Sequence, residues 1–258
     1  MKDVLIVARK EIQDHLRDTR SLASSFLYAS MGPAVVLLVS LSNSGDTARR
    51  ATLLVSMASV FALVSAVAGG MSVAMDAMAG ERERRSLVPL LLTPASRFDL
   101  VLGKWLATCA FALGALTVTI CGFLPVVLWR APVGWIVLVQ LGVWVLLGLI
   151  PLALAGSAAH LLLSANSRTT QEANGWLSIA VFLPMLAGMF LVFFPSWVGT
   201  WWFLVPIIGQ QSLVIRGLAG QPATVVQAAV LAVVTLAVAI PALLATRRAL
   251  ERDDVVTG

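Results

Sequence analysis

The chain has 258 residues, of which 59% are hydrophobic and only 12% are charged, and its formal net charge is +5. Soluble domains carry about a quarter charged residues, so this composition excludes an ordinary soluble protein and indicates a polytopic membrane protein. The basic balance does not indicate nucleic-acid binding, because the basic residues gather in short segments between apolar runs. The sequence contains no GxxxxGK[ST] phosphate-binding loop, so an ATP-binding module would have to come from another chain.

Residues 1–21 predict an amphipathic helix at the membrane interface. Apolar side chains at helical spacing share one arc of this segment, and charged side chains fill the rest. A helix of this kind, placed just before a span, is typical of one that lies in the membrane surface. The alternative is a solvated N-terminal helix with no partner. The segment is charged throughout and is not a secretory signal, so the following apolar run should be retained as a span. The apolar arc consists of Val4, Leu5, Ala8, Ile12, Leu16 and Thr19.

Six apolar runs lack Asp, Glu, Lys and Arg, and each is long enough to cross the hydrocarbon core, which takes about 20 helical residues. Lipid cannot satisfy unpaired backbone groups, so the runs must be helical. The sequence therefore predicts an all-α fold with six transmembrane helices in one transmembrane domain, 1–258. The predicted spans are 22–41, 52–75, 105–129, 135–163, 176–194 and 224–245.

The segment 76–104 is a charged island between the second and third runs. We predict a helix–break–helix elbow, with a first helix over 81–92 and a break before Pro94, because the residue before proline avoids the α region. Ser96 is expected to cap the second helix, with Asp99 three residues later in a capping-box variant. The elbow should lie at or beyond the membrane surface, since its charges cannot face lipid.

The distribution of basic residues predicts the orientation. Most Lys and Arg residues lie in the N-terminal segment, the elbow, the 164–175 turn and the C-terminal tail, which alternate with the other loops along the chain. The positive-inside bias therefore puts these segments and both termini in the cytoplasm. The segment 195–223 is rich in Trp, Pro and Gly, and we interpret it as an external re-entrant hairpin. The alternative, a seventh distorted span, would move the basic C-terminal tail outside.

Ionisable side chains at membrane depth are rare and usually functional, and His160 is the one that the six runs offer. An intramembrane enzyme would have to use His160 with Ser157 or Ser164, and the sequence has no HExxH, no CxxC and no paired intramembrane carboxylates. We therefore expect a satisfied interfacial histidine and no catalytic, cofactor-binding or metal-binding residues on this chain. Cys109 and Cys121 are expected to be free thiols that pack as small apolar groups.

Three motifs carry a resemblance to a known family: Gly80–Leu87 (GERERRSL), Leu90–Arg97 (LLLTPASR) and Leu102–Lys104 (LGK). With the interfacial helix, they resemble the permease subunit of ABC transporters of the type-2 exporter superfamily, closest to its sodium-exporter (NatB-like) branch. The family commonly has Gly-Thr where this chain has Arg85-Ser86. The short segment 42–51 leaves no room for the branch's large external domain, so sodium does not follow as the substrate.

The resemblance implies an ATP-driven exporter in a prokaryotic inner membrane, in which this chain forms half of the translocation path. Two permease copies, as a homodimer, would pair with two cytoplasmic ABC ATPase subunits that carry ATP and magnesium. The elbow would be the coupling helix, and the 164–175 turn a second, smaller contact. The implied coupling residues are Glu81, Arg82, Glu83, Arg84, Arg85, Leu87, Leu90, Leu91, Pro94 and Arg97, and those of the interface helix are Arg9, Lys10 and Glu11.

Two other functions stay open on the sequence: a membrane scaffold or assembly factor that uses the same elbow without transport, and the intramembrane enzyme centred on His160. The cargo is also open. The predicted spans carry no Asp, Glu, Lys or Arg that could serve as a specific counter-ion, which favours a lipophilic or amphipathic cargo over a bare ion.

Overall fold

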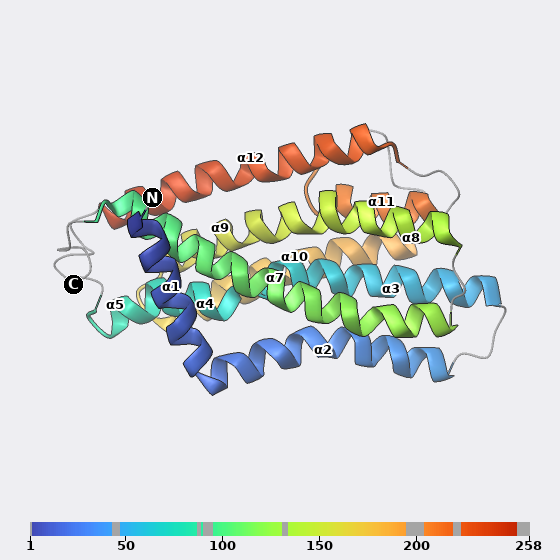
Figure 1. The fold of residues 1–258 in the computed structure, drawn as a ribbon, viewed down its shortest axis with the longest axis horizontal. Helices are drawn as coiled ribbons and strands as arrows, with labels where there is room; N and C mark the ends of the chain where they lie inside the picture. The colour runs from blue at the N-terminus through green and yellow to red at the C-terminus, as the bar shows by residue number, and fades with distance from the viewer. Residues whose placement is uncertain are drawn as a thin grey trace.

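The computed structural model describes residues 2–42, 47–86, 89, 95–130, 134–194, 204–218 and 223–251. In these ranges the chain is helical apart from short turns, which confirms the all-α prediction, and the helices form an elongated bundle (Figure 1). In chain order the elements are α1 (Lys2–Arg17), α2 (Thr19–Ser42), α3 (Thr47–Ala68), α4 (Met71–Met75), the π-helix η1 (Asp76–Gly80), α5 (Glu81–Glu83), α7 (Arg97–Arg130), α8 (Trp135–Trp144), the π-helix η2 (Val145–Leu149), α9 (Ile150–Asn166), α10 (Thr170–Phe193), α11 (Ile208–Leu218) and α12 (Val225–Leu250).

Within the described residues, five helical stretches are long and apolar enough to cross a membrane. They correspond to the second to sixth predicted spans. The first predicted span lies in α2, whose apolar part, Ser25–Leu41, is shorter, so a sixth span remains a prediction. The five stretches are Ala51–Glu83, Arg97–Val126, Leu138–Asn166, Thr170–Phe193 and Val225–Leu250.

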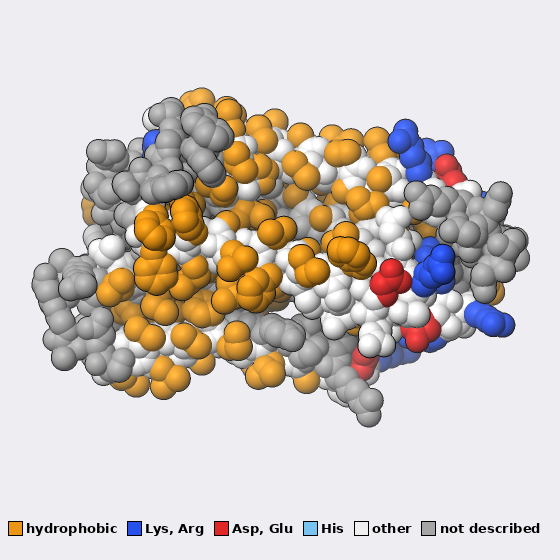
Figure 2. All heavy atoms as spheres, turned by 180° about the vertical axis from the view of Figure 1, so that it is seen from behind, with side chains coloured by type: hydrophobic (Ala, Val, Ile, Leu, Met, Phe, Trp, Pro, Cys, Tyr) orange, Lys and Arg blue, Asp and Glu red, His pale blue; other side chains and the backbone are white. Residues whose placement is uncertain are grey.

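The two ends of the bundle differ in chemistry. On the face that Figure 2 shows, most of the charged side chains gather at one end and apolar side chains are spread over the middle of the bundle. We call this the charged end; α1 and α5 lie there, and α12 ends there (Figure 1). The opposite, or far, end holds the beginnings of α8 and α12 (Figure 1). Large apolar side chains on the outside, such as Val233 at 66% exposure, fit a surface that faces lipid.

The second membrane-crossing stretch is broken before it reaches the elbow. A Cβ on Gly70, between α3 and α4, would lie 2.7 Å from the Thr108 methyl carbon, so the break packs directly on α7. The chain then forms a π-turn, η1, and such turns occur often at functional sites. This turn leads straight into the first residues of the predicted elbow.

The first helix of the elbow is shorter than predicted: it ends at Glu83, not near residue 92. The Ser86 amide donates to the Glu81 carbonyl at 2.9 Å and the Arg85 amide to the Arg82 carbonyl at 3.0 Å, the two bonds of a Schellman motif. Arg85 takes the left-handed conformation that this motif needs, with φ 56°. Because residue 85 is an arginine and not the usual glycine, no local signal in the sequence predicts this helix end.

The start of the elbow's second helix is confirmed. The Asp99 amide donates to Ser96 Oγ at 3.1 Å, and Ser96 Oγ donates to the Asp99 carboxylate at 2.6 Å. The helix α7 accordingly begins at Arg97. The predicted break before Pro94 and most of 87–94 lie outside the described residues.

The predicted apolar arc of α1 divides into two parts. Val4 and Ala8 are buried, together with Val7, and α1 packs on α7. Leu5 and Leu16 remain 62% and 55% exposed. The helix therefore has one face on the bundle and a neighbouring apolar stripe that is free to meet lipid, as an interfacial helix requires.

The predicted hairpin 195–223 is described only in part. Its helix α11 packs among α3, α8, α10 and α12 at the far end of the bundle. Gln210, Gln211 and Ser212 are all fully buried, and Gln211 exchanges hydrogen bonds with Ser59 of α3. Re-entry into the membrane remains a prediction.

Candidate functional site

The most unusual side chain at the charged end is Lys104, which is fully buried two turns into α7. Its Nζ lies 3.0 Å from Glu11 Oε1 of α1 and 2.7 Å from Glu81 Oε2 of α5. Both carboxylates are themselves buried. Burying an unpaired charge is strongly unfavourable, so the ammonium fixes α1 and α5 against α7 at the same time.

Lys10 closes this group on the solvent side. Its Nζ lies 3.5 Å from Glu11 Oε1 and 3.7 Å from Glu81 Oε1. We call Lys10, Glu11, Glu81 and Lys104 the ion cluster; its two cations and two carboxylates balance. The cluster joins the predicted interface helix, the start of the elbow and the motif that closes it.

The ion cluster shifts the pKa values of its members on α1. Burial raises the pKa of the Glu11 carboxyl, but the charge and hydrogen bond of Lys104, with smaller contributions from Lys10 and His15, outweigh it, and the net pKa lies below 4.5. Burial lowers the pKa of Lys10, but the charges of Glu11, Glu81 and Asp14 outweigh it and the net pKa is raised. Both groups are therefore held in their charged forms.

The next two residues of α5, Arg82 and Glu83, form hydrogen bonds with the turn between α9 and α10. The Arg82 guanidinium donates to the carbonyls of Ala165 at 2.9 Å and Ser167 at 2.8 Å, at the end of α9. The Glu83 carboxylate accepts from the Thr170 amide at 2.9 Å and its hydroxyl at 2.8 Å, at the start of α10. A cation at a helix C-terminus and an anion at an N-terminus both complement the helix dipole. The elbow and the 164–175 turn are therefore in direct contact.

The π-turn η1 is held by a side chain from the same region of α9. The Ala79 amide donates to Ser164 Oγ at 3.1 Å, and that hydroxyl donates to the Met75 carbonyl at 3.2 Å. Because a π-turn disrupts the regular α-helical bonding, the fully buried Ser164 supplies the missing partner. This contact sets the direction in which Glu81 leaves the bundle.

Asp76, at the start of η1, contacts basic side chains from two other segments of the site. Its carboxylate lies 2.8 Å from Arg84 Nη2 and 3.7 Å from His15 Nε2. A Cβ on Gly80 would collide with the same carboxylate, which explains why a glycine precedes Glu81.

The structure brings most predicted coupling and interface residues into one place and separates a few. Arg97 lies apart from the ion cluster, where its Nη1 donates to the Leu250 carbonyl at 2.6 Å and ties α7 to the end of α12. Arg9 and Arg85 are exposed. The predicted positions Leu87, Leu90, Leu91 and Pro94 lie outside the described residues.

Three residues hold this site together in ways that the sequence did not predict: Lys104, Ser164 and Asp76. The sequence marks Lys104 as the end of a motif, but it does not show that Lys104 pairs with Glu11 and Glu81. The signal is a lone cation directly before the apolar run 105–129, where a buried charge needs a carboxylate within reach.

His160 differs from its prediction. It is fully buried instead of interfacial, and neither ring nitrogen forms a hydrogen bond with the part of the chain that is described. Ser164, one suggested partner, bonds to η1 instead. No group of three or more metal-ligating side chains occurs among the described residues. Cys109 and Cys121 are unpaired, as predicted.

Comparison with known proteins agrees with this architecture. A family model described as "ABC-2 family transporter protein" matches residues 5–255. The ABC transporter permease protein NatB of Bacillus subtilis (strain 168) is 35% identical over 175 residues, which cover 63% of this chain and 45% of NatB. The aligned part is therefore less than half of that relative. Since the family model spans nearly the whole chain, the chain belongs to the ABC-2 family transporter proteins and is a multi-pass transmembrane ABC transporter permease.

Proposed function

We propose that this permease is the membrane subunit of an ATP-driven exporter and that the elbow, 81–97, couples it to a separate ATPase. The observation that carries the proposal is the ion cluster, which makes the base of the elbow a rigid junction of α1, α5 and α7. A polar segment held so firmly at the end of a membrane bundle suits the transmission of force from a partner.

The proposed orientation puts the charged end in the cytoplasm, in a prokaryotic inner membrane with both chain ends on that side. The clustering of charged side chains at this end supports it (Figure 2), as does the positive-inside bias. The ATPase would then meet the elbow from the cytoplasm and carry ATP and magnesium.

The contacts of its first residues suggest two roles within the elbow. Glu81 is only 7% exposed, and Arg82 and Glu83 bond to the α9–α10 turn, so these three residues anchor the elbow. Arg84 and Arg85 are exposed and would face the ATPase. The remaining residues of the proposed docking surface are Leu87, Leu90, Leu91, Pro94 and Arg97.

Movement of the elbow would reach the spans by two routes. The ion cluster links Glu81 to α1 and α7, while Arg82 and Glu83 link it to the ends of α9 and α10. Closure of two ATPases could therefore tilt several spans as rigid bodies in each of two permease copies, which together would form the path.

A cavity in the bundle supports an amphipathic cargo. It has a volume of about 440 Å³ and lies between α2, α3, α7 and α10. Its lining combines apolar side chains with hydroxyl and amide groups and includes no Asp, Glu, Lys or Arg among the described residues. The polar lining residues are Ser25, Ser65, Ser72, Thr119, Asn174 and Ser178. Such a surface offers hydrogen bonds to a cargo without fixing its charge.

The experiment is to purify the tagged permease from membranes of its host and measure the associated ATPase. In proteoliposomes, ATP hydrolysis should rise with the right cargo in a screen of sodium, drugs, peptides and lipids. Arg85→Glu should reduce the copurified ATPase several-fold while leaving the thermal unfolding midpoint unchanged, and Lys2→Glu, on the exposed side of α1, is the matched control.

Two results would count against the proposal. Undiminished ATPase association in Arg85→Glu, combined with unchanged hydrolysis in the anchor variant Glu81→Lys, would remove the elbow as the coupling segment. Stable assembly with an ATPase but no cargo-dependent hydrolysis for any cargo would indicate the membrane scaffold instead.

A further inference from the structure

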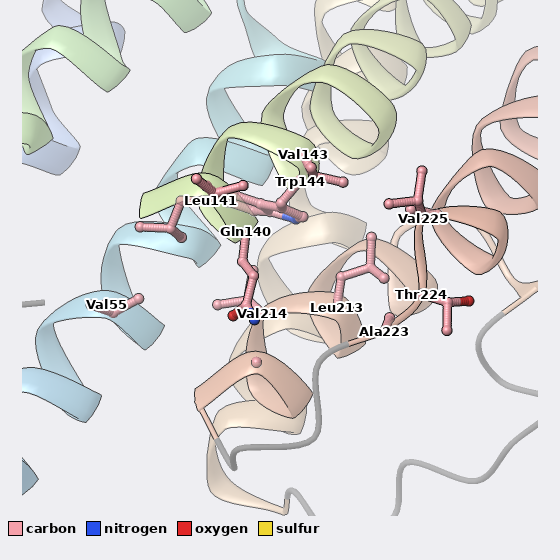
Figure 3. A pocket seen from close by; sticks show the side chains of 13 residues that line it. Val55, Gln140, Leu141, Val143, Trp144, Leu213, Val214, Ala223, Thr224 and Val225 are labelled. Atoms are coloured by element: carbon pink, nitrogen blue, oxygen red, sulfur yellow. The ribbon is translucent and has the colours of Figure 1, made fainter. Parts of the chain in front are cut away.

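A separate cavity of about 400 Å³ lies at the far end of the bundle, between α3, α8, α11 and α12 (Figure 3). We call it the far-end pocket. It shares no residue with the ion cluster or with the cavity between α2, α3, α7 and α10. Volumes of this size are typical of pockets for small ligands.

The lining of the far-end pocket is aliphatic with one available polar group. Trp144 Nε1 donates to the Gln210 carbonyl at 2.9 Å, and Thr224 Oγ1 accepts from the Gln227 amide as a helix cap. The Gln140 amide, in contrast, forms no hydrogen bond with the described residues. Its side chain extends from α8 toward α11 in Figure 3, and a Cβ on Gly217 would lie 3.4 Å from its Oε1.

The position of the pocket along the bundle corresponds to the edge of a membrane leaflet. Its lining includes residues from the second turn of α8 and the first turn of α12. Trp135, at the start of α8, is 73% exposed, and tryptophan favours the level of the lipid headgroups. Val139 and Val225 line the pocket and are 56% and 63% exposed, so the mouth opens toward lipid.

A basic side chain lies beside the pocket lining on α11. Arg216 is in the last turn of α11, next to the lining residue Gly217, and at helical spacing it projects about 60° beyond the Leu213 edge of the lining face. It forms no ion pair within the described part of the chain and is half-buried. A guanidinium in this setting matches the planar, charged oxygens of a phosphate.

We propose that the far-end pocket binds one phospholipid from the adjoining leaflet. The acyl chain occupies the aliphatic space between α8 and α12, an ester carbonyl accepts a hydrogen bond from the Gln140 amide, and the phosphate pairs with Arg216. The inference goes beyond the proposed function and holds whether or not the permease exports a cargo.

The test uses the full-length permease in vesicles that contain a trace of phosphatidylglycerol with a photoactivatable group in one acyl chain. Mass spectrometry should find the label concentrated on α8, α11 and α12. Gly217→Leu, which fills the pocket, should lower this labelling several-fold. Gly142→Leu is the matched control, because a Cβ on Gly142 meets nothing within 4 Å, and it should label like the parent.

Arg216→Gln separates headgroup recognition from chain binding. It should lower labelling by the phosphatidylglycerol probe several-fold and leave labelling by a photoactivatable diacylglycerol, which has no phosphate, unchanged. Because Arg216 forms no ion pair among the described residues, the variant should keep the thermal unfolding midpoint of the parent. Gln140→Leu provides a second pocket variant if Gly217→Leu does not fold.

Three results would overturn the proposal. Label spread evenly over all lipid-facing helices would show ordinary contact with bulk lipid. Labelling unchanged in both pocket variants, Gly217→Leu and Gln140→Leu, would show that the pocket is not the site. Crosslinking of Val225→Cys between two permease copies, with loss of lipid labelling, would assign the pocket to a permease interface.

Discussion

The ammonium of Lys104 lies 2.7 Å from a carboxylate oxygen of Glu81, at a position where neither side chain reaches solvent to a significant extent. Glu81 begins the elbow and Lys104 follows its end, so this pair closes the base of the elbow. Glu11 adds the interface helix to the same ammonium at 3.0 Å. The two ends of the elbow are therefore held against the bundle by one cation, which is the property that a coupling segment needs.

Lys104→Met should destabilise the permease strongly. It leaves the buried carboxylates of Glu11 and Glu81 without their shared cation, a loss of about 3–5 kcal/mol for a broken buried pair. The measurement is the thermal or denaturant midpoint in detergent. Lys2→Met, an exposed change on α1, should leave the midpoint unchanged, and an equal effect of the two variants would contradict the role of the ion cluster.

Arg85→Gly should stabilise the permease by about 1 kcal/mol. Arg85 has φ 56°, a conformation that costs glycine nothing and other residues about 1 kcal/mol. Arg84→Gly should destabilise instead, because Arg84 has right-handed geometry and pairs with Asp76. If the unfolding midpoint falls for both variants, the left-handed conformation of Arg85 does not limit the stability of this helix end.

Gly103→Leu should detach α1 from the bundle. A Cβ on Gly103 would lie 2.6 Å from the Val7 Cβ and 2.9 Å from the Val4 carbonyl oxygen, so a larger side chain cannot fit while α1 stays in place. Trypsin should then cleave α1 at Arg9 or Lys10 at least tenfold faster. Gly114→Leu on the same helix is the control, since a Cβ there meets nothing within 4 Å. Equal cleavage rates in the two variants would contradict the close packing.

Stability should fall in acid because of Glu11. Its pKa in the folded protein is lowered below 4.5, mainly by Lys104 against the opposing effect of burial, so the ion pair contributes fully above pH 4.5 and is lost as the pH falls through the folded value. The unfolding midpoint of the parent should therefore decline below about pH 4.5. Glu11→Gln should start lower at neutral pH and decline less; an identical pH slope in both proteins would contradict this assignment.

Much of the fold was predictable because the lengths of the apolar runs and the positions of the charged segments can be read directly from the sequence. Apolar runs of span length predicted the helices of the second to sixth spans, and the charge bias predicted that one end would collect the charges. The details depended on contacts between distant residues. Nothing local in the sequence shows that Ser164 completes the bonding of η1, or that α1 would bury Glu11 in preference to Leu5.

The sequence predicted which segment forms the site, but not the contacts that its side chains make. The GERE motif predicts the start of the elbow, and the resemblance implies that its charges face a partner. Glu81, Arg82 and Glu83 instead bond to α7 and to the α9–α10 turn, because those elements present a buried cation and unsatisfied helix ends. Only the three-dimensional arrangement shows which of these charges bond to other elements. Arg84, which is exposed like Glu83, pairs with Asp76, and Arg85 is exposed.

The central claim is that the elbow meets an ATPase, and crosslinking tests it most directly. In a variant with Cys109 and Cys121 replaced by alanine, Ser86→Cys would carry a thiol-linked photocrosslinker in native membranes, and Thr224→Cys at the far end would be the comparison site. The account predicts that Ser86→Cys captures a protein with an ABC ATPase phosphate loop, in a yield that changes with ATP. Capture of such an ATPase from Thr224→Cys and not from Ser86→Cys would contradict it.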